Sequence, residues 1–267
     1  MPKRTVLITG ASAGIGEAFA NVFAAEGFDL IVVARREDRL RALASRLAQQ
    51  HGTSTHVIVS DLSTRESASQ ICANLDEHGL VVDGLVTNAG YGVPGVFAAS
   101  RWARHEAMLQ VMLLGVLELT YRLLPGMIQR RYGRIITVAS LAGLVPATAG
   151  HTLYGATKSF LIKFAEALSA ETRGDGVHVT AVCPGFTYSE FHDVTGTRDK
   201  VSQLPPWMWM DAATVARQGF DAVMAGTPVY VNGRVNRTIA GLVRLMPQRL
   251  VHAVAHRTSG RYRNADE

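Results

Sequence analysis

Short apolar runs alternate with segments of helical length along most of this 267-residue chain. The runs are rich in valine and isoleucine, as buried strands are, and they span residues 5–9, 29–34, 56–60, 84–88, 134–139, 177–183 and 228–231. Each connection between them is long enough for a crossover helix, so we expect the strands to run parallel. The pattern predicts an α/β fold with one doubly wound parallel sheet of about seven strands and helices on both faces. Ligands of such sheets bind at the carboxyl ends of the strands.

A glycine-rich turn follows the first of these strands. It leads from the strand 5–9 into a helical run over Glu17–Glu26. Glycines at a strand-to-helix turn allow the backbone to approach a pyrophosphate, whose charge the helix N-terminus then stabilises. The turn predicts a dinucleotide site that includes Gly10, Ser12, Gly14, Ile15 and Gly16.

A tyrosine and a lysine lie four residues apart at Tyr154 and Lys158. We expect this segment to be helical, which places the two side chains on one face. An ammonium group beside a phenol favours the phenolate, so Lys158 is expected to lower the pKa of Tyr154 and to favour proton exchange with a substrate oxygen. Taken alone, the spacing is more often an exposed helix pair, and its meaning depends on the surrounding motifs.

Five motifs together resemble those of the short-chain dehydrogenase/reductase family, and they occur in the family's order over about residues 5–190. They are T-G-x-x-x-G-x-G at Thr9–Gly16, Asn88-Ala89-Gly90, Ser140, the Tyr154/Lys158 pair and Pro184-Gly185. The resemblance implies a single Rossmann-type domain over residues 1–267. Its cofactor-binding and catalytic core would be 5–190, and residues 191–267 would form a substrate lid and a basic C-terminal segment.

The resemblance also implies roles at the catalytic end of the site. Ser140 would hydrogen-bond the substrate oxygen and polarise a carbonyl. Tyr154 would be the general acid/base, and Lys158 would lower its pKa and hold the nicotinamide ribose. The turn Pro184-Gly185 and Thr187 would receive the nicotinamide carboxamide, and Ser189 would bind a cofactor phosphate.

At the adenine end, the resemblance places the ribose against the backbone of Asn88, Ala89 and Gly90, with Asn88 linking neighbouring strands. Asp61 ends the third strand, and two roles stay open for it. By resemblance it accepts a hydrogen bond from the adenine amino group. It also suits an N-cap of a helix whose first turn would be 63–66.

The end of the second strand bears on cofactor choice. Folds that select NAD commonly place an acid there to bind the ribose 2′-hydroxyl, whereas an arginine accommodates a 2′-phosphate. This chain has Ala34 followed by Arg35 and Arg36, which favours NADP(H) over NAD(H) with Arg35 as the 2′-phosphate ligand. The alternative is two solvated arginines at the start of the helix 37–50, and nearby Asp38 keeps NAD open.

One position departs from the family pattern. Residues 101–130 are expected to form one helix broken only near Pro125. Within it, Met112 stands where relatives usually have an asparagine that is thought to hold a water molecule linking the lysine to solvent. A thioether is a weak acceptor and cannot donate a hydrogen bond, so the sequence puts the proton relay in doubt.

Two segments are expected to shape the substrate side. Ser140 lies 14 residues before Tyr154, one more than the family spacing, and the extra residue would enlarge the loop 146–151 that forms part of the substrate wall. His151 in this loop is more often a bystander than a catalyst. The apolar segment Leu204–Met210 is interpreted as a substrate lid, with a core cap or dimer contact as the alternative. Asp211 is a candidate N-cap for a helix over 212–225.

Charge is concentrated at the C-terminal end. The chain carries a net +5, and all of it falls after residue 222, where seven arginines face two acids. Residues 236–256 combine arginines with apolar residues at helical spacing. Two interpretations stay open, a weak contact with a membrane surface or an acidic carrier, and a packed terminal helix with solvated arginines. No nucleic-acid partner and no metal site are expected.

Composition sets the remaining expectations. The N-terminus lacks the apolar stretch of a signal peptide, and Cys72 and Cys183 are expected to be free thiols. A cytoplasmic homo-oligomer, dimer or tetramer, with any membrane contact peripheral, is expected. The sequence predicts an NADP(H)-dependent oxidoreductase that moves hydride between nicotinamide and a carbonyl or secondary alcohol of an apolar substrate, such as a 3-oxoacyl thioester, a steroid or a lipophilic ketone. The alternative is a catalytically weakened dinucleotide-binding protein that acts as a sensor or partner-binding module.

Overall fold

The computed structural model describes residues 3–147, 149–150, 152–191, 195 and 204–247. Seven strands form one parallel sheet in the order β3-β2-β1-β4-β5-β6-β9. The predicted α/β fold is therefore confirmed, and each predicted strand differs from the observed one by no more than one residue at either end. The strands are β1 (Thr5–Thr9), β2 (Asp29–Ala34), β3 (Thr55–Val59), β4 (Gly84–Thr87), β5 (Gly133–Val138), β6 (Val177–Cys183) and β9 (Val229–Val231).

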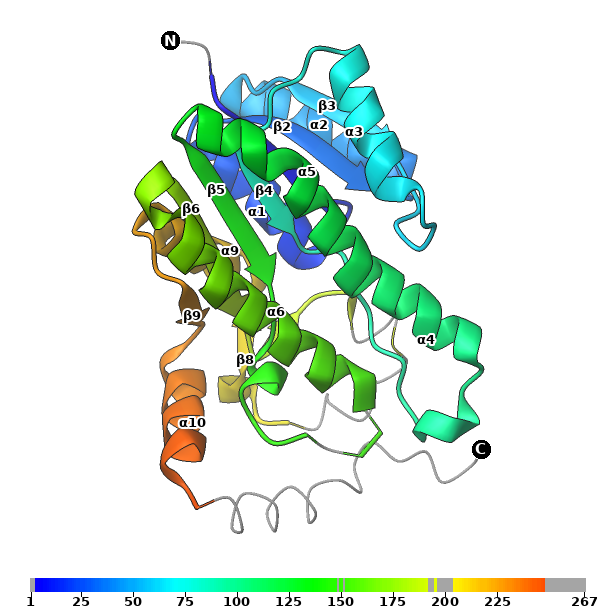
Figure 1. Ribbon diagram of the computed structural model, residues 1–267, viewed down its shortest axis with the longest axis vertical. Helices are drawn as coiled ribbons and strands as arrows, with labels where there is room; N and C mark the ends of the chain where they lie inside the picture. The colour runs from blue at the N-terminus through cyan, green and yellow to red at the C-terminus, as the bar shows by residue number, and fades with distance from the viewer. Residues whose placement is uncertain (1–2, 148, 151, 192–194, 196–203, 248–267) are drawn as a thin grey trace.

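Helices cover both faces of this sheet (Figure 1). One layer packs Phe19, Leu40 and Phe220 against the sheet, and it consists of α1 (Gly14–Ala25), α2 (Glu37–His51) and α9 (Ala212–Met224). The layer on the opposite face packs Ile71 and Leu161 against the sheet. It consists of α3 (Ser67–Glu77), α4 (Trp102–Leu109), α5 (Gly115–Gln129) and α6 (Thr152–Thr172). Because both faces are buried, the strands are apolar throughout rather than alternating with polar residues.

The strand order reverses between β1 and β4, which lie side by side at the centre of the sheet. Chains leaving these two strands diverge to opposite halves of the sheet, and the crevice between them is where ligands of doubly wound sheets bind. The fold thus predicts a site next to the turn that follows β1 and the turn that follows β4.

The expected break at Pro125 is wrong. Pro125 lies inside α5, and the irregularity falls earlier, in a π-helical turn, η2 (Gln110–Leu114), between α4 and α5. Proline removes the hydrogen bond to the residue four positions before it, here the exposed Tyr121, where water can satisfy the carbonyl. The combined helix over 102–129 is long and apolar enough to cross a membrane, but Met108, Met112 and Leu119 belong to the core beneath it.

A second, smaller sheet was not predicted. It pairs β7 (Phe186–Tyr188) in parallel with β8 (Trp209–Asp211) beyond the carboxyl ends of the main strands. Asp211 accepts hydrogen bonds from the backbone N–H of Thr214 at 2.6 Å and from its hydroxyl at 2.7 Å, which confirms the predicted N-cap of α9.

The remaining described elements are one helix and four short 3₁₀ turns. The helix α10 (Arg234–Leu245) begins the basic segment, and residues 248–256 of that prediction lie outside the described residues, as does His151. The 3₁₀ turns are η1 (Phe97–Ala99), η3 (Leu141–Gly143), η4 (Arg173–Asp175) and η5 (Pro206–Met208).

We predict that Gly16→Ala destabilises the protein, because a Cβ at this position would lie 2.5 Å from Asn88 Nδ2 and still closer to the carbonyl oxygen of Gly10. Overpacking of this kind costs about 1–3 kcal/mol, measured as the free energy of unfolding in urea. Gly241→Ala is the matched control, since nothing lies within 4 Å of its added Cβ and alanine favours the helix by about 1 kcal/mol. Equal stability of the two variants would contradict the prediction.

Candidate active site

One cavity of about 830 Å³ runs along the carboxyl ends of the central strands. Every residue predicted from the sequence for the site lines this cavity except Gly16, whose Cα instead packs against the backbone of Gly10. Gly16 is therefore needed for the close packing of the turn and does not line the site. The predicted residues in the lining are Gly10, Ser12, Gly14, Ile15, Arg35, Asp61, Asn88, Ala89, Gly90, Ser140, Tyr154, Lys158, Pro184, Gly185, Thr187 and Ser189.

Two turns at the strand-order reversal are tied to each other by Asn88 and Thr9. The Asn88 side-chain amide donates to the carbonyl oxygens of Thr9 at 3.0 Å and Gly10 at 3.2 Å. The Thr9 hydroxyl accepts from the backbone N–H groups of Asn88 at 3.0 Å and Ala89 at 3.2 Å. The expectation that Asn88 links neighbouring strands is confirmed, and the link fixes the glycine-rich turn beside β4.

Gly14 begins α1 with a φ of +58°, a conformation that favours glycine. The backbone also makes a close contact at this point, because an added Cβ would lie 2.9 Å from the Cβ of Ser189. The N-terminus of α1 therefore opens toward a narrow part of the cavity. Unpaired N–H groups at a helix N-terminus attract an anion such as a pyrophosphate.

Arginines and Asp61 lie at the end of the cavity formed by β2 and β3. Asp61 accepts from the backbone N–H of Ser63 at 3.0 Å and from its hydroxyl at 2.8 Å, and chiefly the backbone hydrogen bond lowers its pKa. Because α3 begins only at Ser67, Asp61 caps a turn, and its predicted role as a helix cap is wrong. Arg35 lines the cavity beside it.

Sequence reasoning missed the contacts of the next arginine. Arg36 donates to the Ser12 hydroxyl through Nη2 at 3.0 Å and Nε at 3.3 Å, and through Nη1 to Glu190 at 2.8 Å. Glu190 also lines the cavity and pairs with Arg39. The sequence indicated a role for Arg35 and Arg36 in cofactor binding. It did not predict that Arg36 pairs with the carboxylate of Glu190, which is 154 residues away.

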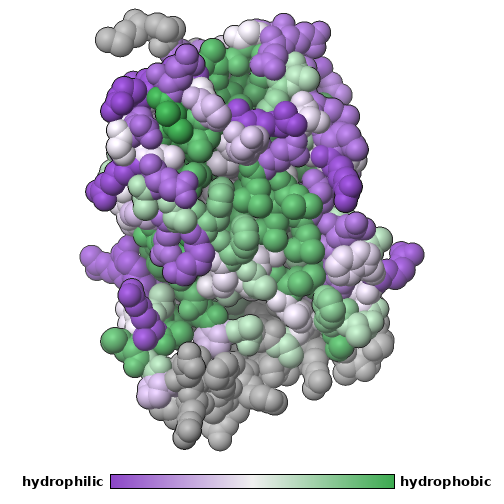
Figure 2. Space-filling model, viewed as in Figure 1, coloured by the Kyte–Doolittle hydropathy of each residue, from purple (hydrophilic) through white to green (hydrophobic). Residues whose placement is uncertain are grey.

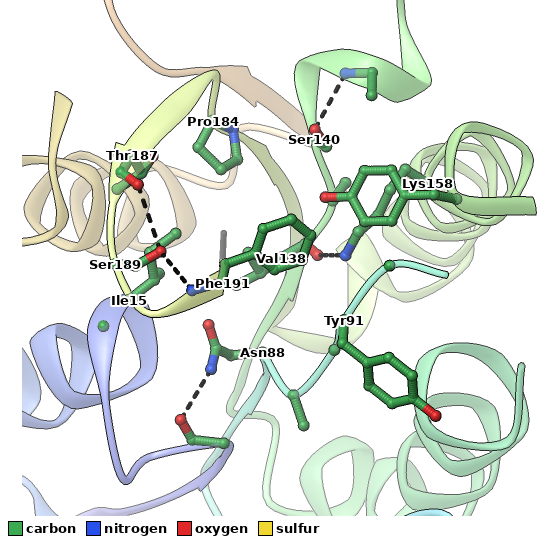
Figure 3. Close-up of a pocket in the computed structure, with 18 of the residues that line it drawn as sticks. Ile15, Asn88, Tyr91, Val138, Ser140, Lys158, Pro184, Thr187, Ser189 and Phe191 are labelled. Atoms are coloured by element: carbon green, nitrogen blue, oxygen red, sulfur yellow. Dashed lines mark hydrogen bonds between the residues drawn. The ribbon is translucent and has the colours of Figure 1, made fainter. Parts of the chain in front are cut away.

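Lys158 is buried beneath Tyr154 on the same face of α6. Its Nζ donates to the carbonyl oxygen of Val138, at the end of β5, at 2.7 Å and lies 5.6 Å from the centroid of the Tyr154 ring (Figure 3). Ser140 follows two residues after Val138, and its side chain is close enough to Tyr154 to act on the pKa of the phenol. The Ser140 oxygen also accepts from the backbone N–H of Ala142 at 3.1 Å. The three predicted catalytic side chains thus lie together.

The pKa values of the pair differ from the sequence-based expectation. Burial raises the pKa of Tyr154 to about 12, and the Ser140 side chain opposes this shift only in part. Burial also lowers the pKa of Lys158 to about 8. The sequence predicted a net lowering of the Tyr154 pKa by Lys158, and the net shift is instead upward, because desolvation disfavours the charged form of both groups and outweighs the nearby ammonium. At neutral pH the phenol is protonated and is a proton donor.

Met112 lies in the π-helical turn η2 and is buried in the core. Its thioether packs beside Gly90, where an added Cβ would lie 3.4 Å from the sulfur. Met112 does not line the cavity, whereas its neighbour Val111 does. The side chain at this position thus faces apolar neighbours.

The wall beyond Ser140 is mostly apolar. The expected contribution of the 146–151 loop is borne out for Pro146 and Ala147, which line the cavity. Of the apolar segment interpreted as a lid, Met208 lines the cavity, while the Trp207 side chain is 64% exposed.

Two residues of α10, Asn236 and Ile239, also line the cavity, and sequence reasoning did not identify them. Asn236 is buried, donates to the carbonyl oxygen of Asn232 at 2.8 Å and packs against Gly185. The basic helix therefore begins as part of the site wall.

Comparisons with known proteins agree with this site. Residues 4–199 match the family model described as short chain dehydrogenase. The chain belongs to this family and is an oxidoreductase, and the resemblance seen in its motifs is confirmed.

Two curated relatives and one solved structure illustrate the likeness. The chain is 35% identical over 192 residues to a serine 3-dehydrogenase of Rhizobium radiobacter, covering 70% of this chain and 73% of the relative. It is 35% identical over 194 residues to an NADP-dependent 3-hydroxy acid dehydrogenase of Escherichia coli, covering 71% and 75%. A short-chain dehydrogenase from Sphingobium yanoikuyae, solved in complex with NADPH, superposes with a TM-score of 0.80 at 28% identity and covers 92% of this chain and 96% of its own.

We predict that Met112→Asn lowers the melting temperature without raising turnover. An amide buried among apolar neighbours and left unpaired costs about 1–3 kcal/mol. Met112→Leu is the control, since it keeps the volume and the apolar character and costs less than about 1.5 kcal/mol. Higher turnover of the asparagine variant, with a changed solvent deuterium isotope effect, would show that the relay is broken at Met112 and would contradict the prediction.

Proposed function

We propose that this protein is an NADP(H)-dependent oxidoreductase that transfers hydride between nicotinamide and a carbonyl or secondary alcohol of an apolar substrate. The observation that carries the proposal is the arrangement of Ser140, Tyr154 and Lys158 at one end of a single cavity whose other end holds Arg35. An elongated dinucleotide matches a cavity with these two ends.

The residues present fit such a cofactor. The close approach of the backbone at Gly14 and the N-terminus of α1 suit a pyrophosphate. At the end of β2, the cavity is lined by Ala34 and Arg35 rather than by an acid, which suits a 2′-phosphate. The NADP-dependent relative and the NADPH-bound structure support the same preference.

The chain's own residues supply the proton and the orientation. A nicotinamide cofactor, when bound, supplies or accepts the hydride. Tyr154 holds a proton at neutral pH and donates it to the substrate oxygen during reduction, while Ser140 orients that oxygen. The ammonium of Lys158 stabilises the negative charge that remains on Tyr154, and Val138 fixes its position.

The lining at the catalytic end supports an apolar substrate. Beyond Ser140, the wall consists mainly of Leu141, Val145, Pro146, Met208 and Ile239, which favours a 3-oxoacyl thioester, a steroid or a lipophilic ketone. The serine and 3-hydroxy acid dehydrogenases among the relatives take their names from smaller, polar compounds. A substrate panel for this protein therefore has to contain both classes.

A homo-oligomer, either dimer or tetramer, is part of the proposal. Figure 2 shows apolar surface over the middle of the face that α5 and α6 occupy in Figure 1. Exposed side chains of this helix layer include Leu114, Tyr121 and Phe160, with exposed fractions of 53%, 78% and 45%. Light scattering of the purified protein would give its mass, and a monomer at micromolar concentration would contradict the proposal.

We also propose that α10 makes a weak contact with an acidic membrane surface or an acidic carrier, in a protein that is otherwise cytoplasmic. Leu242 and Leu245 are exposed beside Arg244, and α10 contains no acidic residue. Cosedimentation with vesicles of anionic lipid tests it, and equal binding to neutral vesicles would contradict the electrostatic contribution.

We predict that Tyr154→Phe abolishes turnover and changes the dissociation constant for NADPH by no more than a few-fold, because the substitution removes only the exchangeable proton. Turnover is measured as loss of NADPH absorbance with lipophilic ketones, steroid ketones, a 3-oxoacyl thioester and small polar carbonyl compounds. Lys158→Ala should weaken both turnover and cofactor binding.

Tyr121→Phe is the matched control for the tyrosine substitution, because Tyr121 is exposed and does not line the cavity. It should retain wild-type turnover. Equal activity of Tyr154→Phe and the wild type would rule out the catalytic assignment, and activity on none of the carbonyl compounds would favour the weakened dinucleotide-binding protein.

The cofactor preference gives a further prediction. Ala34→Asp combined with Arg35→Ala should shift the ratio of the NADPH and NADH dissociation constants at least about tenfold toward NADH, because charged hydrogen bonds contribute about 1.5–3 kcal/mol each. Fluorescence titration measures both constants. Arg41→Ala, which removes an arginine paired with Glu37 and absent from the cavity lining, is the control. Wild-type protein that binds NADH as tightly as NADPH would refute the role of Arg35.

A further inference from the structure

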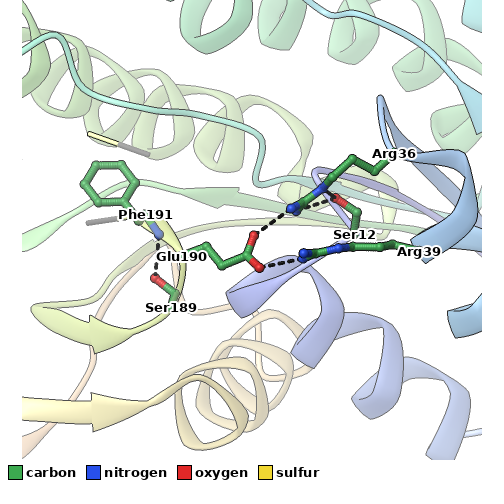
Figure 4. Close-up of polar contacts among 6 residues, drawn as sticks. All are labelled: Ser12, Arg36, Arg39, Ser189, Glu190 and Phe191. Carbon is green, nitrogen blue, oxygen red and sulfur yellow. Dashed lines mark hydrogen bonds and ion pairs between the residues drawn. The ribbon is translucent and has the colours of Figure 1, made fainter. Parts of the chain in front are cut away.

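A three-residue segment, Ser189–Phe191, lines the cavity next to the glycine-rich turn. It follows β7, and its first residue lies against Gly14, as the close approach of Ser189 shows. The second residue, Glu190, directs its carboxylate toward the start of α2, where it pairs with Arg36 and Arg39 (Figure 4). Segments more than 150 residues apart in sequence are joined by these ion pairs.

Arg36 extends this link back to the glycine-rich turn. Its Nε and Nη2 atoms donate to the Ser12 hydroxyl, while Nη1 donates to Glu190 (Figure 4). Ser12, Arg36 and Glu190 therefore form a continuous polar bridge, and all three line the cavity. The bridge connects the turn after β1 with the segment after β7.

The same segment also reaches the catalytic end. The ring of Phe191 packs at a centroid distance of 5.6 Å from the ring of Tyr154. Glu190 thus contacts Arg36, just before α2, and Arg39, within α2, while Phe191 contacts the proton donor on α6. A dinucleotide bound between Arg35 and Tyr154 has to pass this segment.

We propose that Glu190 is a cofactor-retaining residue: its ion pairs with Arg36 and Arg39 hold Ser189–Phe191 across the bound dinucleotide, and the cofactor leaves only when these pairs separate. The inference rests on the proposed function, since it concerns how long the cofactor stays in that site. The paired side chains are 40–45% exposed, so water and salt reach them. Ion pairs of this kind are weakened by salt and open readily, as exchange of a cofactor requires.

The opposite role, competition between Glu190 and the 2′-phosphate for the arginines, fits the geometry less well. The donor nitrogens of Arg36 are directed to Ser12 and Glu190, and Arg39 does not line the cavity. Arg35 makes no ion pair among the described residues and is the arginine that the site offers to a phosphate. The two roles predict opposite effects on affinity when the charge of Glu190 is removed.

The test is the release rate of the bound cofactor in Glu190→Gln. The purified chain is loaded with NADPH or with NADH, and release into excess oxidised cofactor is followed by nucleotide fluorescence in a stopped-flow instrument. We expect the dissociation rate constant to rise about tenfold for both nucleotides, because the loss of one partner of a charge pair acts mainly on dissociation. Added salt should accelerate release from the wild type and have little effect on the variant.

Three further variants separate the effect of the Glu190 ion pairs from a general loss of surface charge. Glu37→Gln removes a carboxylate from α2 that pairs with Arg41 outside the cavity, and it should release cofactor at the wild-type rate. Arg39→Gln should accelerate release in the same direction as Glu190→Gln. The double variant Glu190→Gln/Arg39→Gln should release cofactor no faster than Glu190→Gln alone, since both changes break one interaction.

An unchanged release rate in Glu190→Gln, or tighter binding of NADPH alone, would overturn the inference, and the second result would establish competition with the 2′-phosphate. Cofactor binding by the wild-type protein distinguishes a failure of the proposed function from a failure of this inference. Wild-type protein that binds neither NADPH nor NADH would overturn both proposals, whereas wild-type binding with unaltered release in the variant would overturn only the retaining role of Glu190.

Discussion

The hydrogen bond from the Lys158 ammonium to the carbonyl oxygen of Val138 is the contact on which the catalytic geometry depends. It joins α6 to the carboxyl end of β5 inside the protein, where an unpaired ammonium would be costly. Because Ser140 follows Val138 by two residues and Tyr154 precedes Lys158 by one helical turn, this single bond sets the positions of both. The partner carbonyl belongs to Val138, the last residue of β5, shortly before the chain enters η3 at Leu141.

Local patterns were enough to predict the sheet and the glycine-rich turn. The strands of a sheet buried on both faces are continuous apolar runs, and a glycine turn between strand and helix is a short-range motif. The structure also brings the predicted residues of distant motifs into one cavity, because the carboxyl ends of parallel strands share an edge. Of the predicted site residues, only Gly16 does not line the cavity, because its tight packing on Gly10 leaves no room for a side chain.

Features that depend on burial or on distant contacts could not be read from the sequence. The π-helical turn at Gln110–Leu114 arises in a helix whose sequence marks only Pro125 as irregular. Glu190 reaches Arg36 across 154 residues. The pKa prediction for Tyr154 considered the neighbouring charge of Lys158 but not the loss of water around both groups, and desolvation is the larger effect here.

Reduction of the proposed kind requires Tyr154, which is partly buried, to be a protonated acid at neutral pH. Ultraviolet difference titration measures its protonation state directly, because tyrosinate absorbs where tyrosine does not. Burial places the pKa of Tyr154 at about 12, so the titration curves of the wild type and of Tyr154→Phe should coincide up to about pH 11. An additional tyrosinate in the wild type that forms below the ordinary tyrosine pKa of about 10 would show that Lys158 outweighs burial, and it would contradict the account.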